Sequence, residues 1–356
     1  MPSFSVTEAF MFRIGIIGCG KIAQVRHLPE YRENPAAEIY GLYDLNGARA
    51  AELAAEYGAK AYPSVEAMLA DPAIDAVSVC TVNDSHAQIA IAALRAGKNV
   101  MCEKPMATTL EDCEEMTRVA AQCGRLLFID QNQRLAEAHR MAHTLIEAGE
   151  IGHVLTFATA FRHGGPETWS VDPGKSTWFF DRKRAAMGAL ADLGVHKTDL
   201  IQYLTGQTIV EVTAKLCTLD KTFSDGSLIT VDDNAFCFFR MSGGAAGTMT
   251  ASWTNYGPED NSTVINGSKG VLRIYTEPEK PLTLIRKSGE TITYDVSPIQ
   301  TNRSQTKSGA IDLFIECLRN PAAQQISAQS VLPAMRAIFA AIESSETGRS
   351  VAVNGG

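Results

Sequence analysis

The stretch that decides the fold is Arg13-Ile-Gly-Ile-Ile-Gly-Cys-Gly-Lys-Ile-Ala23. Its isoleucines predict a buried strand that breaks at Gly18, turns through Gly20 and enters a helix at Ile22. Gly18 permits a tight turn, and Gly20 lets the backbone approach a pyrophosphate at the helix N-terminus. A small residue, Ala23, completes a G-x-G-x-x-A fingerprint. A chance glycine-rich turn has the same local pattern, so the sequence around the loop decides between the two. If the loop binds a dinucleotide, the contacts are expected from Gly18, Gly20, Lys21 and Ile22.

The segment after the loop supplies that context. Ala37–Tyr43 has the pattern of a second apolar strand and ends at Asp44, 24 residues beyond Gly20. A carboxylate at about this distance binds the ribose hydroxyls in dinucleotide-binding folds, although Asp44 also suits the N-cap of a helix over 46–57. Its charge favours NAD, because it would repel the 2′-phosphate of NADP. Arg49 would suit that phosphate, so NADP stays open, but a solvated helix arginine is the simpler interpretation.

The rest of the first half alternates between strands and helices. Further apolar strands are expected near 60–62, 75–82, 98–102 and 126–129, and Thr108 with Glu111 suggests a capping box for the last helix between them. Such alternation predicts a parallel, doubly wound sheet over residues 12–131. Ligands of these sheets gather at the carboxyl ends of the strands, which adds to the cofactor candidates Thr81, Val82, Asn83, His86, Glu103 and Lys104.

Two of these candidates also have ordinary structural interpretations. His86 fits the first turn of a helix, and Glu103 fits a surface charge. Lys104 is more informative, because Pro105 restricts the preceding residue to extended geometry and thereby fixes the lysine at the mouth of the sheet.

Bulk properties limit the classes of function. The 356 residues suggest two domains, and 45% hydrophobic with 20% charged residues is typical of a globular protein. A net charge of −8 without a basic run argues against nucleic acid and acidic membrane surfaces, and no apolar run reaches the length of a membrane span. Eight scattered cysteines without a C-x-x-C pair predict reduced thiols in the cytoplasm. Residues 1–11 form a lead-in without secretory-signal features.

The second half, 132–356, changes character. A helix is expected over 137–148, and long strands follow at 153–162, 209–219, 232–241, 245–255, 263–266, 271–275 and 282–294, the last in two pieces. Runs of strands predict a large, mostly antiparallel open sheet. One face of it needs a cover, which helices, the first domain or another subunit would provide. Two helices, over 309–318 and 328–345, end the chain.

Polar residues in this half suggest a reactive site. On a helix Asp192, His196 and Asp199 share one stripe, which is either a structural hydrogen-bonding knot or a general acid/base with its orienting groups. Arg162 and His163 end a strand, where they either contact a polar ligand or begin a loop. Aromatic residues in that loop would line a sugar pocket or form a hydrophobic lid: Trp169, Trp178 and Phe179. The pair His139 and His143 has metal-site spacing but no third ligand, so a solvated helix face and no metal are predicted.

Taken together, these residues resemble the family of glucose–fructose oxidoreductase, inositol dehydrogenase and the rhizopine-catabolism oxidoreductases. The resemblance runs from about Phe12 to Val353. It rests on five motifs: Gly18-Cys-Gly-Lys-Ile-Ala23, Asn83-Asp-Ser-His86, Cys102-Glu-Lys-Pro105, Leu145-Ile-Glu-Ala-Gly-Glu-Ile-Gly152 and the segment Gly188–Leu200. It implies an α/β protein with a Rossmann domain and a second α/β domain whose open sheet often mediates homodimers or homotetramers.

The resemblance also implies a reaction. Lys104, Asp192 and His196 would surround the nicotinamide of NAD(P) during hydride transfer to or from a carbinol carbon of a sugar, inositol or related polyol. His196 and Lys104 would act as the acid–base pair, Asp192 would orient the substrate, and Asn132 would contact the nicotinamide end. Arg162, His163 and Trp178 are the further substrate candidates.

Three points stay open at this stage. Some relatives are redox-neutral NAD-dependent glycosidases, and others are non-catalytic, cofactor-sensing regulators, for which an intact catalytic set is not needed. The family often has Gly-Gly-Gly before the catalytic helix, whereas this chain has Ala186-Met187-Gly188, which predicts a narrowed or reshaped pocket entrance and leaves the substrate open.

Overall fold

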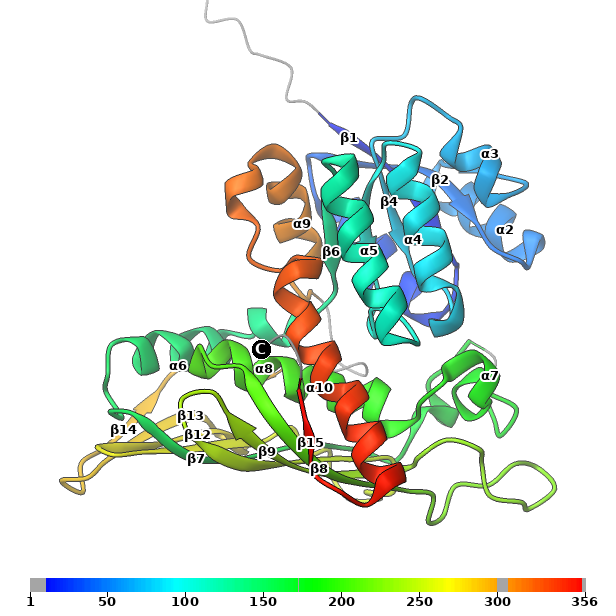
Figure 1. The fold of residues 1–356 in the computed structure, drawn as a ribbon. Helices are drawn as coiled ribbons and strands as arrows, with labels where there is room; N and C mark the ends of the chain where they lie inside the picture. The colour runs from blue at the N-terminus through cyan, green and yellow to red at the C-terminus, as the bar shows by residue number, and fades with distance from the viewer. Residues whose placement is uncertain (1–10, 172, 300–306, 354–356) are drawn as a thin grey trace, which may run out of the picture.

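A computed structural model describes residues 11–171, 173–299 and 307–353. The expected lead-in therefore lies outside the described residues, apart from Met11. The chain forms two layered units, a parallel sheet wrapped by helices and a larger sheet covered by helices on one face (Figure 1).

The first unit is a six-stranded parallel sheet in the order β3-β2-β1-β4-β5-β6. This is the order of a doubly wound dinucleotide-binding fold, as the alternating pattern predicts. The strands span Phe12–Ile17 (β1), Ala37–Tyr43 (β2), Lys60–Ala61 (β3), Ala76–Val79 (β4), Asn99–Cys102 (β5) and Leu127–Ile129 (β6). Strands β1, β4, β5 and β6 are largely apolar and buried, because helices cover both faces of a parallel sheet.

The helices between these strands are Leu28–Glu33 (α1), Gly47–Tyr57 (α2), Val65–Leu69 (α3), His86–Arg95 (α4) and Leu110–Cys123 (α5). Side-chain caps fix several of their starts, since Ser64 accepts from the Ala67 amide and Asn46 from the Arg49 amide. The predicted capping residue Thr108 is wrong by one position. Thr109 is the N-cap of α5 and accepts from the Asp112 amide, which makes Asp112 the N3 residue.

The second unit is a nine-stranded sheet in the order β14-β13-β12-β11-β7-β10-β9-β8-β15. Its strands are Val154–Arg162 (β7), Ile209–Cys217 (β8), Asn234–Met241 (β9), Ala246–Ser252 (β10), Thr263–Gly267 (β11), Gly270–Glu277 (β12), Lys280–Arg286 (β13), Thr291–Tyr294 (β14) and Val351–Ala352 (β15). The pairings are antiparallel except that between β7 and β10, so the predicted mostly antiparallel sheet is confirmed.

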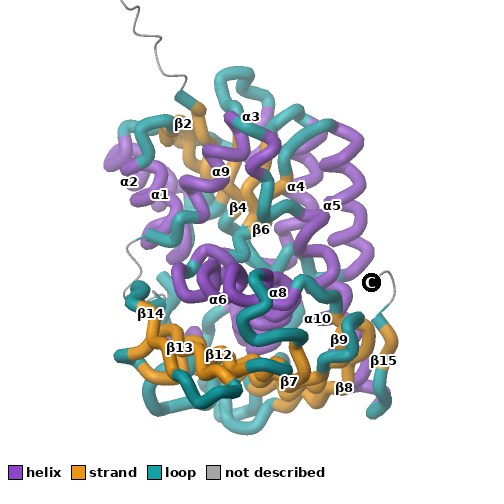
Figure 2. The backbone as a smooth tube through the Cα atoms, turned by 90° about the vertical axis from the view of Figure 1, so that its left-hand side faces the viewer, coloured by secondary structure: helices purple, strands orange, loops and turns teal. Residues whose placement is uncertain are grey.

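Helices lie between this sheet and the first unit. These are α6 (Glu137–Glu147), α8 (Val195–Thr205) and α10 (Ala328–Thr347), as Figures 1 and 2 show. Alternate side chains of β9 are buried, whereas Phe236 and Phe238 are nearly half exposed. The helices therefore cover one face of the sheet, and part of the other face carries exposed aromatic residues.

The chain returns to the first unit before it ends. Helix α9 (Ala310–Arg319) lies beside β6 in Figure 1 and contacts α1. The rings of Phe314 and Phe128 meet edge to face with 5.8 Å between their centroids. Ser308 donates to the buried carboxylate of Glu30 from its backbone amide at 2.7 Å. The division into 12–131 and 132–356 stays a prediction, and α9 belongs spatially with the first part.

Within the described ranges, no helix combines the length and the apolar character that are needed to cross a membrane.

Candidate active site

A cavity of about 940 Å³ lies between the two units. This volume is at the upper end of the usual range for small-molecule sites, roughly 300–1,000 Å³. The cofactor residues predicted from the sequence that line it are Gly18, Gly20, Lys21, Ile22, Asp44, Thr81, Val82, Asn83, Glu103, Lys104 and Asn132. Four predicted substrate residues also line it: His163, Trp178, Asp192 and His196.

The glycine-rich loop has the shape that a dinucleotide requires. Gly18 has a φ of +95°, and a Cβ there would lie 2.7 Å from the backbone of Cys80. At Gly20 a Cβ would meet no heavy atom within 4 Å, so the backbone faces open space. The loop enters a helix at Lys21 and Ile22, and the helix continues through a π-helical turn at Ala23–His27 (η1) into α1.

Asp44 lies at the end of β2 beside this loop. Its two carboxylate oxygens accept from the amides of Cys19 and Asn46, each at 2.7 Å. The helix N-cap is Asn46, so the alternative role of Asp44 as N-cap is wrong. Arg49 approaches the Asp44 carboxylate to 4.0 Å. The loop and the acidic residue are thus tied to each other, as the dinucleotide-binding interpretation requires.

The prediction that His86 contacts the cofactor needs correction. His86 is buried and does not line the cavity. Its Nδ1 lies 2.8 Å from the Pro105 carbonyl oxygen and its Nε2 lies 3.1 Å from that of Thr81. The ring therefore joins the loops that follow β4 and β5 and positions them from behind.

Lys104, Asp192 and His196 meet on one wall of the cavity. Lys104 Nζ donates to the Asp192 carboxylate at 2.8 Å and to the Asp192 carbonyl oxygen at 2.9 Å. The other carboxylate oxygen of Asp192 accepts from the indole N–H of Trp253 at 3.0 Å. Burial opposes ionisation of Asp192, but the Lys104 charge, nearby His163 and the hydrogen bonds outweigh it, and the pKa of Asp192 is lowered. This wall therefore holds a fixed ammonium–carboxylate pair.

His196 lies one helical turn beyond Asp192. Burial and then the Lys104 charge lower its pKa well below the usual value, so the imidazole is neutral at pH 7. A neutral imidazole on a cavity wall can accept a proton from a ligand hydroxyl. The turn that carries Asp192, Leu190–Gly194 (η6), is π-helical, and such turns often occur at functional sites.

The third member of the predicted stripe lies elsewhere. Asp199 is buried against Arg134, whose Nε donates to its carboxylate at 2.7 Å. It does not line the cavity. The solvated face predicted for His139 and His143 is wrong for His139, which is fully buried with its Nδ1 2.7 Å from the Gln133 carbonyl oxygen. His143 is half-buried and stacks on Tyr203.

Aromatic side chains form the wall nearest the 163–184 loop. Trp178 and Phe179 stack at 3.9 Å between ring centroids and line the cavity together with Trp169. Met187 also lines it, and the effect of Ala186-Met187-Gly188 on the pocket entrance stays a prediction. Arg162 does not line the cavity: its guanidinium pairs with Asp260, so the predicted substrate contact of Arg162 is corrected.

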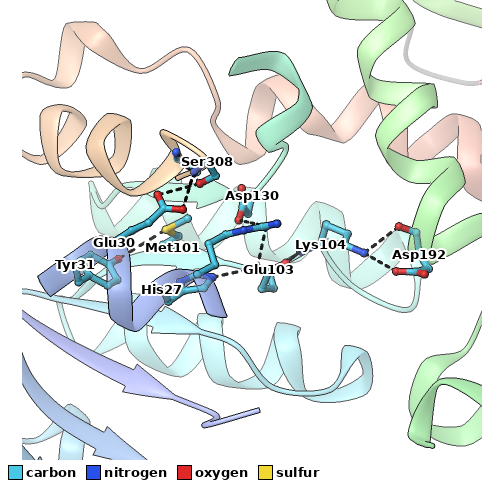
Figure 3. A network of polar contacts seen from close by, with 11 residues as sticks. His27, Glu30, Tyr31, Met101, Glu103, Lys104, Asp130, Asp192 and Ser308 are labelled. Carbon is cyan, nitrogen blue, oxygen red and sulfur yellow. Dashed lines mark hydrogen bonds and ion pairs between the residues drawn. The ribbon is translucent and has the colours of Figure 1, made fainter. Parts of the chain in front are cut away.

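Sequence reasoning missed a buried ion network behind Lys104 (Figure 3). Arg26 Nη1 lies 3.4 Å from Asp130 and 3.9 Å from Glu103, and His27 Nε2 lies 3.0 Å from Glu103. Burial opposes the ionised form of Glu103, but His27, Arg26 and Lys104 prevail and lower its pKa. Burial and the Glu103 charge raise the pKa of Asp130.

The three groups of this network that resemble metal ligands, His27, Glu103 and Asp130, lie within 4.8 Å of one another. Because the Arg26 guanidinium already supplies a positive charge there, we interpret the cluster as an ion network that fixes the Glu103-Lys104 segment. Arg26 and His27 come shortly after the fingerprint loop, and this position is the feature of the sequence that could have pointed to the network. Trp253, the other missed residue, lies just after β10 without any such motif.

Comparisons with known proteins identify both units. Residues 12–131 match a family model described as an oxidoreductase family with an NAD-binding Rossmann fold, and residues 139–273 match the C-terminal domain model of the same GFO/IDH/MocA group. These two matches confirm the predicted Rossmann domain and NAD as its cofactor.

Individual relatives agree with these models. The 1,5-anhydro-D-fructose reductase of Ensifer adhaerens is 34% identical over 205 residues, which cover 57% of this chain and 60% of that protein. The myo-inositol 2-dehydrogenase of Thermotoga maritima is 28% identical over 77% of both chains. A solved NAD binding oxidoreductase from Klebsiella pneumoniae has a TM-score of 0.84 at 26% identity, covering 97% of this chain and 100% of that one.

Proposed function

The chain belongs to the GFO/IDH/MocA oxidoreductase family, and from this premise we propose that it is an NAD-dependent dehydrogenase or reductase of a sugar, inositol or related polyol. The observation that carries the proposal is that Lys104, Asp192 and His196 line the same cavity as the dinucleotide loop, with Lys104 bonded to Asp192. The relatives named above act on an anhydrosugar and on an inositol, which supports this class of substrate.

NAD, when bound, supplies the acceptor or donor of a hydride. The residues that would hold it are Gly18 and Gly20 at the pyrophosphate, Asp44 at the ribose, and Thr81, Val82 and Asn132 toward the nicotinamide. They fit this role because the loop is open at Gly20 and Asp44 is anchored to the loop backbone.

His196 takes the proton of the reacting hydroxyl during oxidation and returns it during reduction. Its lowered pKa keeps it unprotonated in the resting enzyme, as a base requires. Lys104 holds the reacting oxygen and stabilises the negative charge that develops on it. Asp192 holds the Lys104 ammonium in place and accepts from a neighbouring hydroxyl of the substrate.

The aromatic wall supports a carbohydrate rather than a small acid. Flat faces such as those of Trp178 and Phe179 pack against the C–H face of a sugar ring, while the polar wall binds its hydroxyls. His163, 3.9 Å from the Asp192 carboxylate, lies where it can add a further hydroxyl contact.

We also propose that the open face of the large sheet is a contact between copies of this chain, in a homodimer or homotetramer. Exposed Leu155, Phe236 and Phe238 on β7 and β9 support this, since monomeric proteins seldom leave large apolar patches uncovered. Light scattering on the wild type and on Phe236→Asp tests it. A monomeric wild type would contradict it.

The experiment for the activity follows the nicotinamide absorbance with NAD⁺ and NADP⁺ across a panel of aldoses, inositols and anhydrosugars. Turnover that is lost in Lys104→Met and His196→Asn is the expected result. Release of an aglycone without net NADH would instead identify a redox-neutral glycosidase. Cofactor binding without any turnover would favour a sensor.

A further inference from the structure

Lys197, the residue after His196, is an unusual feature of helix α8. Its side chain is fully buried, and Nζ donates to the backbone carbonyl oxygen of Asn261 at 2.9 Å. Burial lowers the pKa of Lys197 to about 7, against the opposing charges of Asp260 and Glu259. Burying a lysine costs free energy, and here the buried lysine fixes the backbone of Asn261.

A second anchor holds the same loop. Arg162 at the end of β7 pairs with Asp260, with 3.1 Å between Nε and the carboxylate. The backbones of the two residues also exchange hydrogen bonds at 2.8 and 3.0 Å. Residues 260 and 261 are therefore fixed from the strand by Arg162 and from the helix by Lys197.

The side chain of Asn261 lies between these two anchors. Asn261 lines the cavity and is 5% exposed, and neither Nδ2 nor Oδ1 has a hydrogen-bond partner in the described part of the chain. A buried amide without partners is rare and unfavourable. It offers one donor group and one acceptor, and a hydroxyl, which both donates and accepts, satisfies both.

We propose that Asn261 binds a hydroxyl of the substrate, and that Lys197 and Arg162 are positioning residues that fix it at the cavity wall. The inference rests on the proposed function and deepens it by naming an additional substrate contact.

The test uses the NADH-loaded full chain and measures binding of myo-inositol and of D-glucose by calorimetry. Turnover is measured separately, so that a polyol that binds without reacting refutes the dehydrogenase but leaves this inference intact. In Asn261→Ala we expect the Kd of the polyol that binds the wild type to rise about tenfold, the value of one neutral hydrogen bond. The Kd for NADH stays within twofold.

Lys197→Met distinguishes positioning from mere stability. It raises the polyol Kd in the same direction, and the double variant with Asn261→Ala is no weaker than Asn261→Ala alone, because both act through one contact. Lys280 is an exposed lysine on β13, so Lys280→Met is the matched control, and we expect it to leave the polyol Kd unchanged.

Asn261→Ala keeps the test decisive if Lys197→Met does not fold, because removing an unpartnered buried amide does not lower the melting temperature. An unchanged polyol Kd in Asn261→Ala overturns the proposal, as does full additivity of the two substitutions or the absence of binding by both uncharged probes.

Discussion

Lys104→Met should lower the stability of the protein as well as its activity. Lys104 Nζ makes two hydrogen bonds to Asp192, whose side chain is 14% exposed. Removing one partner of a buried ion pair typically costs about 3–5 kcal/mol, because the other charge stays buried without compensation. Trp253 and His163 still face the carboxylate, so we expect a loss of about 3 kcal/mol at pH 7.

The pH dependence of this loss has a definite sign. Because the folded-state pKa of Asp192 is lowered, the pair's contribution in the wild type is complete above the unfolded pKa, about 3.9. It is lost as pH falls through the folded value. In Lys104→Met burial prevails and the pKa of Asp192 rises. The deficit of the variant is therefore largest at neutral pH and shrinks as the pH falls toward the raised pKa.

Urea-induced unfolding of the cofactor-free protein between pH 5 and pH 8 measures these changes, since bound NAD would mask them. The double variant Lys104→Met/Asp192→Asn should recover to within about 1 kcal/mol of the wild type, because no charge is left unpaired. Lys280→Met, which breaks an exposed pair with Glu277, provides the control. A loss in Lys104→Met no larger than in this control would refute the reasoning.

Three further predictions concern the reaction and the cofactor. His196→Asn should lower kcat by about 10²–10⁴-fold with an unchanged Kd for NADH. In the wild type, burial and the Lys104 charge lower the pKa of His196, so the acid limb of the kcat/KM profile should lie below pH 6.5. An acid limb above that pH would contradict the assignment of His196 as the base. Asp44→Ala should raise the KM for NAD⁺ by about tenfold, the loss of about one hydrogen bond, and bring the KM values of NAD⁺ and NADP⁺ closer together; steady-state kinetics with both cofactors check this. Gly18→Ala should abolish NADH binding in a fluorescence titration, because the backbone has a φ of +95° and the new Cβ would lie 2.7 Å from Cys80; wild-type binding would show that the loop is more adaptable than its geometry indicates.

Local patterns predicted much of the fold. The parallel sheet follows from short apolar strands alternating with helices, and β2 has the predicted bounds, Ala37–Tyr43. Strand ends were less accurate, since a strand was predicted over 75–82 and β4 spans only Ala76–Val79. The pattern of side chains along a strand does not show where its backbone hydrogen bonds to the neighbouring strand end.

Single motifs named candidates that do line the cavity, but the sequence did not show the contacts between residues from distant segments. Lys104 and Asp192 were both identified, but their direct pairing depends on how the two units pack. Arg162 was misassigned because its partner Asp260 lies on a distant loop that no periodicity connects to β7. His86 was misassigned because the sequence places a residue at the sheet mouth without specifying where the ring points.

The return of α9 to the first unit has a consequence for biosynthesis. Glu30 is buried and accepts from Ser308, a residue 278 positions later in the chain. At a translation rate of about 5–20 residues per second, this partner is made roughly 15–55 s after Glu30. Once residue 131 has been made, the nascent dinucleotide-binding unit still lacks both Ser308 and Phe314, so the Glu30 carboxylate and the Phe128 edge are not yet covered. The unit thus completes its surface only near the end of synthesis, which makes its final closure a late, chain-length-dependent step.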